Sequence, residues 1–238
     1  MAYAERVMKC PGCTTEMSHL VLEGRLGTTI EIDLCSVCRA IWFDRFEDFR
    51  LTPGATLKVF GVISEPPGRP ITPFPTAPHC PRCHARLLLT HDIQRNTRFQ
   101  YLRCDSGHGR LMTFVDFLRE KDFVRPLTPQ QLEELRQSVQ TINCSNCGAS
   151  IDLVKDSVCR HCGSAVSMLD LQQMTRTVGQ LQAAASGRQA SDGAPPVASP
   201  RAQSDIDALV QAFKAAGRTD SAPGLIETGL GLLRQLLK

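Results

Sequence analysis

Short stretches in which hydrophobic and polar residues alternate recur along the first half of the chain. In residues 29–34, two isoleucines and a leucine share one face, and threonine and carboxylate side chains share the other. This alternation is typical of a half-buried β-strand. A shorter apolar stretch at 19–23 precedes it, and two glycines between the stretches favour a turn. The pattern predicts a β-hairpin.

A second hairpin is predicted from residues 87–93 and 98–103, with a turn between them. Aromatic and arginine side chains alternate along its later strand. Exposed aromatics between arginines can stack on bases while the guanidinium groups meet phosphates; alternatively, the aromatics fill a small core. The possible nucleic-acid-binding residues are Arg95, Arg98, Phe99, Tyr101 and Arg103.

Apolar residues at helical spacing predict several short helices. Thr128 and Pro129, with Gln131 completing a capping box, form a strong helix start. The last segment places Ile226, Leu230, Leu233 and Leu237 on one face; because short helices are marginal alone, it should dock on its own chain, a second copy or another protein. The predicted helices span residues 44–51, 114–121, 128–141, 168–185, 205–216 and 223–237.

Ten of the eleven cysteines fall in Cys-x-x-Cys pairs. Two thiols at this spacing can bind one metal ion, and a hairpin can supply a second pair that completes a tetrahedron of soft ligands. Eleven cysteines and one histidine would give three sites of four ligands. The three groups are Cys10, Cys13, Cys35 and Cys38; Cys80, Cys83, Cys104 and His108; and Cys144, Cys147, Cys159 and Cys162.

The second group needs a histidine because no Cys-x-x-Cys pair follows Cys104. His108 stands four residues later between two glycines, which let the backbone turn tightly. His79, His84 and His91 are the other possible ligands. The first two adjoin the cysteines of the pair, so we expect their rings to point away from the metal.

Three structural zinc ions fit this pattern better than disulfides, because the cysteine number is odd and no apolar signal peptide opens the chain. Cys80-Pro81-Arg82-Cys83-His84 also matches the haem attachment pattern, but that chemistry requires export and leaves Cys104 without a role. Only 5% of the residues are aromatic, so we expect no large core. Zinc would replace that missing burial.

The fold class predicted is a small metal-stapled α+β chain: three tandem zinc ribbons joined by short helices, with a disordered tether and C-terminal amphipathic helices. A run of prolines between residues 64 and 79 predicts an extended spacer, and a serine-, glycine- and proline-rich segment predicts the tether. The segments are ribbon 1 at 1–51, a proline-rich linker at 52–79, ribbon 2 at 80–126, a connecting helix at 127–143, ribbon 3 with a helix at 144–185, the tether at 186–204 and the C-terminal helices at 205–238.

The first ribbon resembles the transcription-factor-IIB-type zinc ribbon found in many small bacterial proteins. The likeness rests on Cys10-Pro11-x-Cys13, on Cys35-x-x-Cys38, and on the sequence Ile41-Trp42-Phe43-Asp44 that follows. Members usually have two glycines after the last cysteine, where this chain has Arg39 and Ala40. The resemblance implies a metal-binding ribbon, and by itself it does not imply transcription. Trp42 is expected to pack over the zinc knuckle; the alternative is that it anchors a partner.

Enzyme motifs are missing from the sequence: there is no P-loop, no dinucleotide-binding glycine motif, no His-Glu-x-x-His and no Gly-x-Ser-x-Gly. We therefore expect a non-enzymatic protein. Residues 51–126 carry 11 basic and 6 acidic side chains, whereas residues 1–50 carry 6 and 8. Only the second ribbon thus has a charge balance that favours phosphate.

The sequence predicts a cytoplasmic zinc-binding adaptor that contacts a protein partner through its ribbons and its C-terminal helix. The alternative is a nucleic-acid-binding or transcription-associated protein that uses the arginine and aromatic side chains of ribbon 2. Membrane binding is not expected, because no stretch of about 20 apolar residues is present and the last helix has few cationic residues.

Overall fold

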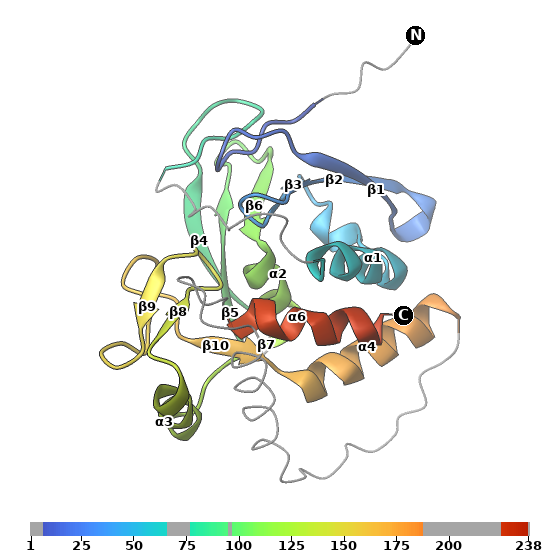
Figure 1. Ribbon diagram of the computed structural model, residues 1–238. Helices are drawn as coiled ribbons and strands as arrows, with labels where there is room; N and C mark the ends of the chain where they lie inside the picture. The colour runs from blue at the N-terminus through green and yellow to red at the C-terminus, as the bar shows by residue number, and fades with distance from the viewer. Residues whose placement is uncertain (1–6, 66–76, 95–96, 188–224, 238) are drawn as a thin grey trace.

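A computed structural model describes residues 7–65, 77–94, 97–187 and 225–237 (Figure 1). Its centre is an antiparallel six-stranded sheet with the strand order β1-β2-β3-β6-β5-β4. The first ribbon contributes β1 (Ser18–Glu23), β2 (Thr29–Cys35) and β3 (Ala40–Asp44). The second contributes β4 (Leu88–Gln94), β5 (Thr97–Arg103) and β6 (Gly109–Thr113). The two expected hairpins are present, and each continues into a third strand that the alternation did not reveal.

The two ribbons join edge to edge through β3 and β6. These strands run antiparallel, with Trp42 opposite Leu111 and Ala40 opposite Thr113. The order of strands in one ribbon mirrors that in the other, so the pair is related by an approximate two-fold axis that passes near the Trp42–Leu111 pair. The proline-rich segment therefore separates the ribbons in sequence but not in space.

Helices cover one face of the sheet, and the first two groups of cysteines lie on the other. Along β3, the side chains of Ile41 and Phe43 enter a core formed with the helices, and those of Ala40 and Trp42 enter a smaller core around the cysteines. This alternation makes β3 buried on both faces. The helical layer contains α1 (Pro53–Ile63), α2 (Phe114–Glu120), α4 (Leu171–Ala185) and α6 (Leu225–Leu236) (Figure 1).

The expectation of no large core is wrong. One continuous cluster joins strand residues such as Ile30 and Met112 to Phe60, Phe117 and Phe123. Phe60 lies against both other phenylalanines, with ring centroids 5.9 and 4.7 Å away. Short apolar stretches that are marginal in isolation combine here, because two ribbons and four helices share one interior.

The helix expected at residues 44–51 is also wrong. Asp44 ends β3, and Phe46 adopts a left-handed backbone with φ 65°, which interrupts any helix at this point. A short 3-10 helix, Asp48–Arg50, follows, and α1 then begins inside the segment expected as a linker. Thr52 caps α1 by accepting a hydrogen bond from the Ala55 amide, with proline at the first helical position.

The third ribbon is a separate small unit beside the main sheet. Its hairpin pairs β8 (Thr141–Asn143) with β9 (Ser150–Asp152), and a two-stranded sheet of β7 (Val124–Pro126) and β10 (Ser167–Leu169) connects it to the helical layer. The connecting helix α3 (Pro129–Ser138) starts with the expected capping box, in which Thr128 and Gln131 bond each other's backbone amides.

The C-terminal part of the chain packs on the chain itself. The predicted segments group α4 with ribbon 3, but its Met174 and Val178 enter the main core beside α1. Ile226, Leu230 and Leu233 of α6 are buried in the same core. The helix predicted at 205–216, and residues 188–204 of the predicted tether, lie outside the described residues.

Candidate metal centres

All twelve candidate ligands gather into three groups of four. In each group the ligand atoms lie within 4.8 Å of one another. The groups are Cys10, Cys13, Cys35 and Cys38; Cys80, Cys83, Cys104 and His108; and Cys144, Cys147, Cys159 and Cys162. Each group takes its ligands from one ribbon, so no site is shared between ribbons.

The donor atoms have the spacing that a tetrahedral metal requires. For metal–sulfur bonds of about 2.3 Å, the edge of the tetrahedron is about 3.8 Å. The Sγ atoms of Cys10 and Cys38 are 3.8 Å apart, and those of Cys144 and Cys162 are 3.7 Å apart. A disulfide needs about 2.05 Å, and all eleven cysteines are free. Soft thiolates in this geometry suit zinc, so the residues present fit three zinc ions.

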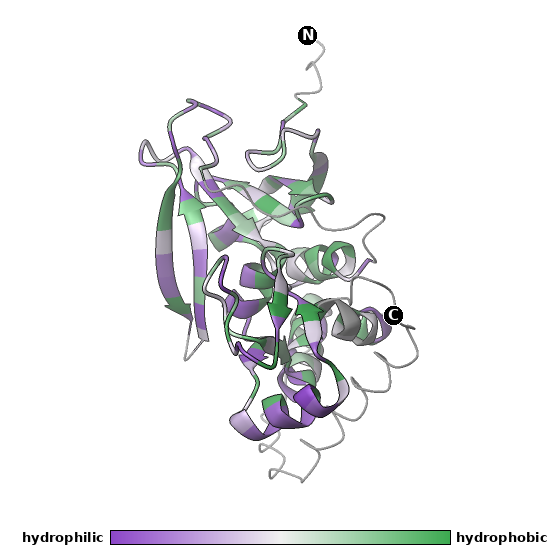
Figure 2. Ribbon diagram, turned by 60° about the vertical axis from the view of Figure 1, so that its left-hand side comes forward, coloured by the Kyte–Doolittle hydropathy of each residue, from purple (hydrophilic) through white to green (hydrophobic). Residues whose placement is uncertain are grey.

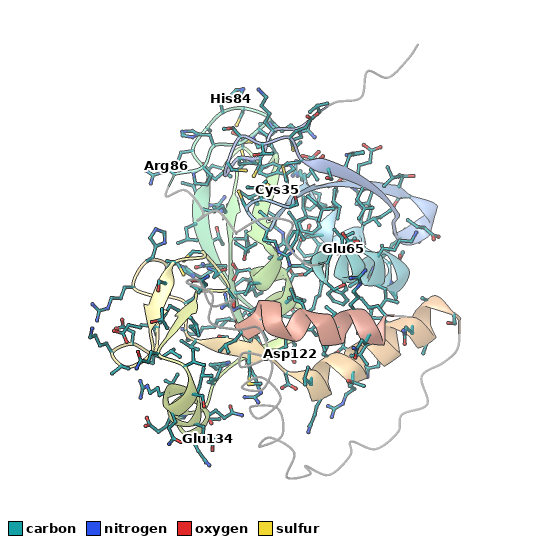
Figure 3. All side chains as sticks on the ribbon, in the orientation of Figure 1. Cys35, Glu65, His84, Arg86, Asp122 and Glu134 are labelled. Carbon is teal, nitrogen blue, oxygen red and sulfur yellow. The ribbon has the colours of Figure 1, made fainter. Side chains whose placement is uncertain are left out.

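The cysteines of the first cluster pack against Ala40 and Trp42 of β3. Cys35, at the end of β2, is labelled in Figure 3. Backbone amides support the sulfurs: Gly12 N donates to Cys10 Sγ at 3.3 Å, and Cys38 N donates to Cys35 Sγ at 3.4 Å. Such hydrogen bonds orient ligands and stabilise their negative charge.

Crowded thiols in this cluster bias one another's protonation. Hydrogen bonding with Cys35 raises the pKa of Cys10 to about 12, while the same contact lowers the pKa of Cys35 to about 2. Ionisation of one cysteine therefore makes ionisation of its neighbours less favourable, unless a cation balances the negative charge. A divalent metal would supply that charge, and protons would leave as it binds.

His108 is the histidine that joins the second cluster. Its Nδ1 lies 3.4 Å from Cys104 Sγ and 3.9 Å from Cys80 Sγ. The competing His79, His84 and His91 are exposed and belong to none of the groups. Figure 3 shows His84 at the outer margin of the molecule. In this cluster, Cys83 is exposed, in contrast to every cysteine of the first cluster.

The third cluster is supported by an asparagine inside its own Cys-x-x-Cys turn. Asn146 Nδ2 lies 3.8 Å from Cys162 Sγ and 3.1 Å from Ser164 Oγ, and its Oδ1 accepts a hydrogen bond from Thr113 Oγ1 at 3.0 Å. Thr113 is also the N-cap of α2. One side chain thus connects the third knuckle to the junction of the main sheet and α2.

The tryptophan and aspartate of the first ribbon link it to the second. Trp42 is completely buried, and its Nε1 donates to Asp44 Oδ1 at 2.8 Å. Asp44 also forms an ion pair with Arg82, which lies between the two cysteines of the second knuckle. The expected packing of Trp42 over the knuckle is confirmed. The ion pair was not found from the sequence, because the partners are 38 positions apart.

Arg39 occupies the place where the resembled family has glycine. Its backbone is left-handed, with φ 55°, a conformation that glycine adopts without strain. The guanidinium compensates by bonding the carbonyl oxygens of Ile63 and Glu65 at the end of α1, at 2.7 and 3.0 Å. It also stacks on Phe114, 4.7 Å from the ring centroid. Arg39 therefore ties the first knuckle to α1 and α2.

The possible nucleic-acid-binding residues do not form an exposed aromatic surface. Phe99 is buried in the main core, and Tyr101 packs against it with ring centroids 6.1 Å apart. Arg110 covers Tyr101 at 4.9 Å from the ring centroid. Arg98 and Arg103 are exposed, and Arg103 pairs with Asp105. Arg95 lies outside the described residues.

Comparisons with known proteins return no match to this chain among family models, curated proteins or solved structures. Within the described part of the chain, no helix has the length and apolar character needed to cross a bilayer.

Proposed function

We propose that this protein is a zinc-stapled, non-enzymatic adaptor that binds a protein partner through the fused first and second ribbons, which resemble ribbons of the transcription-factor-IIB type. The observation that carries the proposal is the completeness of the three ligand groups. Each supplies four protein donors. A catalytic zinc keeps one position open for water or substrate, so these sites suit a structural role.

Exposed aromatic side chains on ribbon 1 suggest where a partner would bind. Phe46 and Phe49 are 57% and 70% exposed and lie in the turn after β3, at residues 45–50. Phe46 is held there on a left-handed backbone, although that conformation costs about 1 kcal/mol. The Arg45 guanidinium stacks on Phe46, 4.7 Å from its ring centroid. Aromatic and arginine side chains are the groups that most often dominate binding energy at protein interfaces.

The apolar face of α6 is packed in the main core and is not available to a partner. The exposed aromatic turn of ribbon 1 is therefore the better candidate for the partner surface. It also favours a protein over nucleic acid. Base stacking needs an accessible aromatic face, whereas Phe99 is buried and Tyr101 lies between Phe99 and Arg110. The acidic balance of ribbon 1 would further repel phosphates.

The test is affinity capture with zinc-loaded protein, comparing wild type with the double variant Phe46→Ala and Phe49→Ala. The expected result is a partner that wild type retains and the double variant loses. Val154→Ala is the control, since the exposed fraction of Val154 lies between those of Phe46 and Phe49 but Val154 lies on ribbon 3. Equal capture by all three proteins would overturn the assignment of the aromatic turn.

Fluorescence anisotropy with single-stranded DNA, duplex DNA and RNA tests the alternative. Phosphate contacts would appear as a steep loss of affinity between roughly 50 and 200 mM salt. We expect no salt-steep binding. Tight binding that Arg98→Ala weakens would replace the adaptor by a nucleic-acid-binding function.

A further inference from the structure

Strand β4 forms one outer edge of the six-stranded sheet, and no strand among the described residues pairs with its outer side. Its seven residues, Leu88–Gln94, are exposed along nearly their whole length, including Leu88, Leu89 and Ile93. Figure 2 shows this strand at the left margin, with hydrophobic positions near both ends. The Ile93 amide bonds the neighbouring Asp92 side chain at 2.8 Å, and no second strand pairs with this edge in the described residues. An edge with apolar side chains, no proline and no partner strand is a template for another strand.

The opposite edge, β1, lacks this character. Leu22 is buried in the core, Glu23 O accepts a hydrogen bond from Thr52 Oγ1 at 3.0 Å, and Gly24 pairs with Leu51 in an antiparallel bridge. One end of this edge is therefore already covered by residues 51–52, which leaves a second strand fewer unpaired backbone groups to bond. The ends of the sheet therefore differ in what they can accept.

We infer that β4 is a dimerisation edge, at which two copies of this chain pair antiparallel about a two-fold axis at His91. This register follows from the strand's own sequence. It places Leu89 of each copy opposite Ile93 of the other, so this apolar pair occurs twice. Thr90 of each copy lies opposite Asp92 of the other. No two like-charged carboxylates or guanidinium groups face each other across the axis, and both exposed apolar residues of this face gain an apolar neighbour.

The proposed pairing ends at two copies. A two-fold contact uses the same surface on both copies, so the product is a dimer with one continuous sheet rather than a filament. Each free end of that sheet is then a β1 edge, where residues 51–52 already bond Glu23 and Gly24, which does not favour further addition. The molecule already contains a similar junction, because β3 and β6 join antiparallel about an approximate two-fold axis. The dimer does not depend on which partner the ribbons bind.

The first test measures molar mass against protein concentration by analytical ultracentrifugation of the zinc-loaded full chain. Wild type should form a reversible dimer. Leu89→Lys should weaken it by about tenfold or more, because two apolar contacts are lost and charge is added at the edge. Val21→Lys is the matched control: Val21 is 56% exposed and Leu89 is 57% exposed, and this variant should dimerise like wild type.

The second test fixes the register. His91→Cys should give a disulfide-linked dimer under mild air oxidation, because opposed residues on paired strands lie within disulfide reach. Val21→Cys should not. A wild-type protein that stays monomeric at high concentration, a dimer that Leu89→Lys leaves intact, or species that keep growing beyond the dimer would each overturn the inference.

Discussion

Ribbons 1 and 2 have the same topology but differ at the metal and at the outer edge. Cys35 and Cys104 hold matching positions, 69 residues apart, as do Trp42 and Leu111 on the two-fold axis. In ribbon 1 the last ligand is Cys38, and the next residue, Arg39, is left-handed. In ribbon 2 the left-handed residue is Gly107, and the ligand moves one position on to His108. The histidine side chain is longer than that of cysteine, so His108 can complete its group of four ligands from one position further along the chain.

The difference shows how one fold can be stabilised in two ways. Ribbon 1 surrounds its cysteines with protein and anchors its knuckle to two helices through Arg39. Ribbon 2 has an exposed ligand, Cys83, and a hairpin whose outer strand has no cover among the described residues. Ribbon 1 can therefore rely on burial, while ribbon 2 would depend more on a metal held by its four ligands and, by our inference, on a second copy.

The largest expected effect comes from removing the metal. We expect three zinc ions per chain, and a chelator should take the first from ribbon 2 because Cys83 is exposed. Losing a structural zinc removes roughly 10 kcal/mol of folding free energy. A chromogenic indicator would count the released zinc, and fluorescence of the single tryptophan, Trp42, would report on the junction.

His108→Ala sharpens this test, since it should lower the zinc count to two or weaken one site strongly. An unchanged count and affinity would assign the ligand role to another histidine. Proteolytic resistance and circular dichroism that survive complete zinc removal would contradict the structural role of the metal.

The next largest effect should come from Gly109→Ala at the ribbon junction. A Cβ there would lie 2.3 Å from Phe43 O and 2.8 Å from the Trp42 ring, so the two ribbons must separate. We expect a loss of more than about 3 kcal/mol in unfolding free energy, measured with urea. Gly107→Ala is the control: it meets no atom within 4 Å and carries only the strain of φ 74°, about 1 kcal/mol. Equal losses would mean that the junction tolerates the added carbon.

A smaller effect is expected from Arg82→Met, which removes the ion pair between the second knuckle and Asp44. Both side chains are partly buried, so the loss should be about 1–2 kcal/mol. Arg103→Met removes a comparable pair with Asp105 that is exposed and should cost less than about 0.5 kcal/mol. Thermal unfolding of both variants, with zinc in excess, makes the comparison. If the two variants lose the same stability, the Arg82–Asp44 pair does not hold the ribbons together.

The smallest effect is a pH dependence in ribbon 1. Burial raises the pKa of Glu47 to about 7, while its carboxylate accepts hydrogen bonds from the amides of Glu31 and Asp44. A raised carboxyl pKa favours folding at low pH, and this contribution is lost as pH rises through 7. Glu47→Gln should therefore gain stability relative to wild type between pH 6 and pH 8, by on the order of 1 kcal/mol or less. A difference that stays constant over this range would contradict the shifted pKa.

The sequence by itself determined the local features of this protein. Cysteine spacing identified the three groups of four ligands, since ligands a few residues apart are constrained by the turn that joins them. Alternation identified the hairpins, and the Thr128–Gln131 capping box located the start of α3. Each of these patterns depends on residues close in sequence, or on the fixed chemistry of a metal tetrahedron.

Only the tertiary structure decided how these pieces combine. The pairing of β3 with β6, the Asp44–Arg82 link and the packing of α4 and α6 against α1 join residues that are distant in sequence. A pattern of apolar residues shows that a surface must be covered but not which segment covers it. The burial of Phe99, the exposure of Phe46 and the large shared core follow from those long-range choices, because burial belongs to the assembled interior rather than to any one stretch.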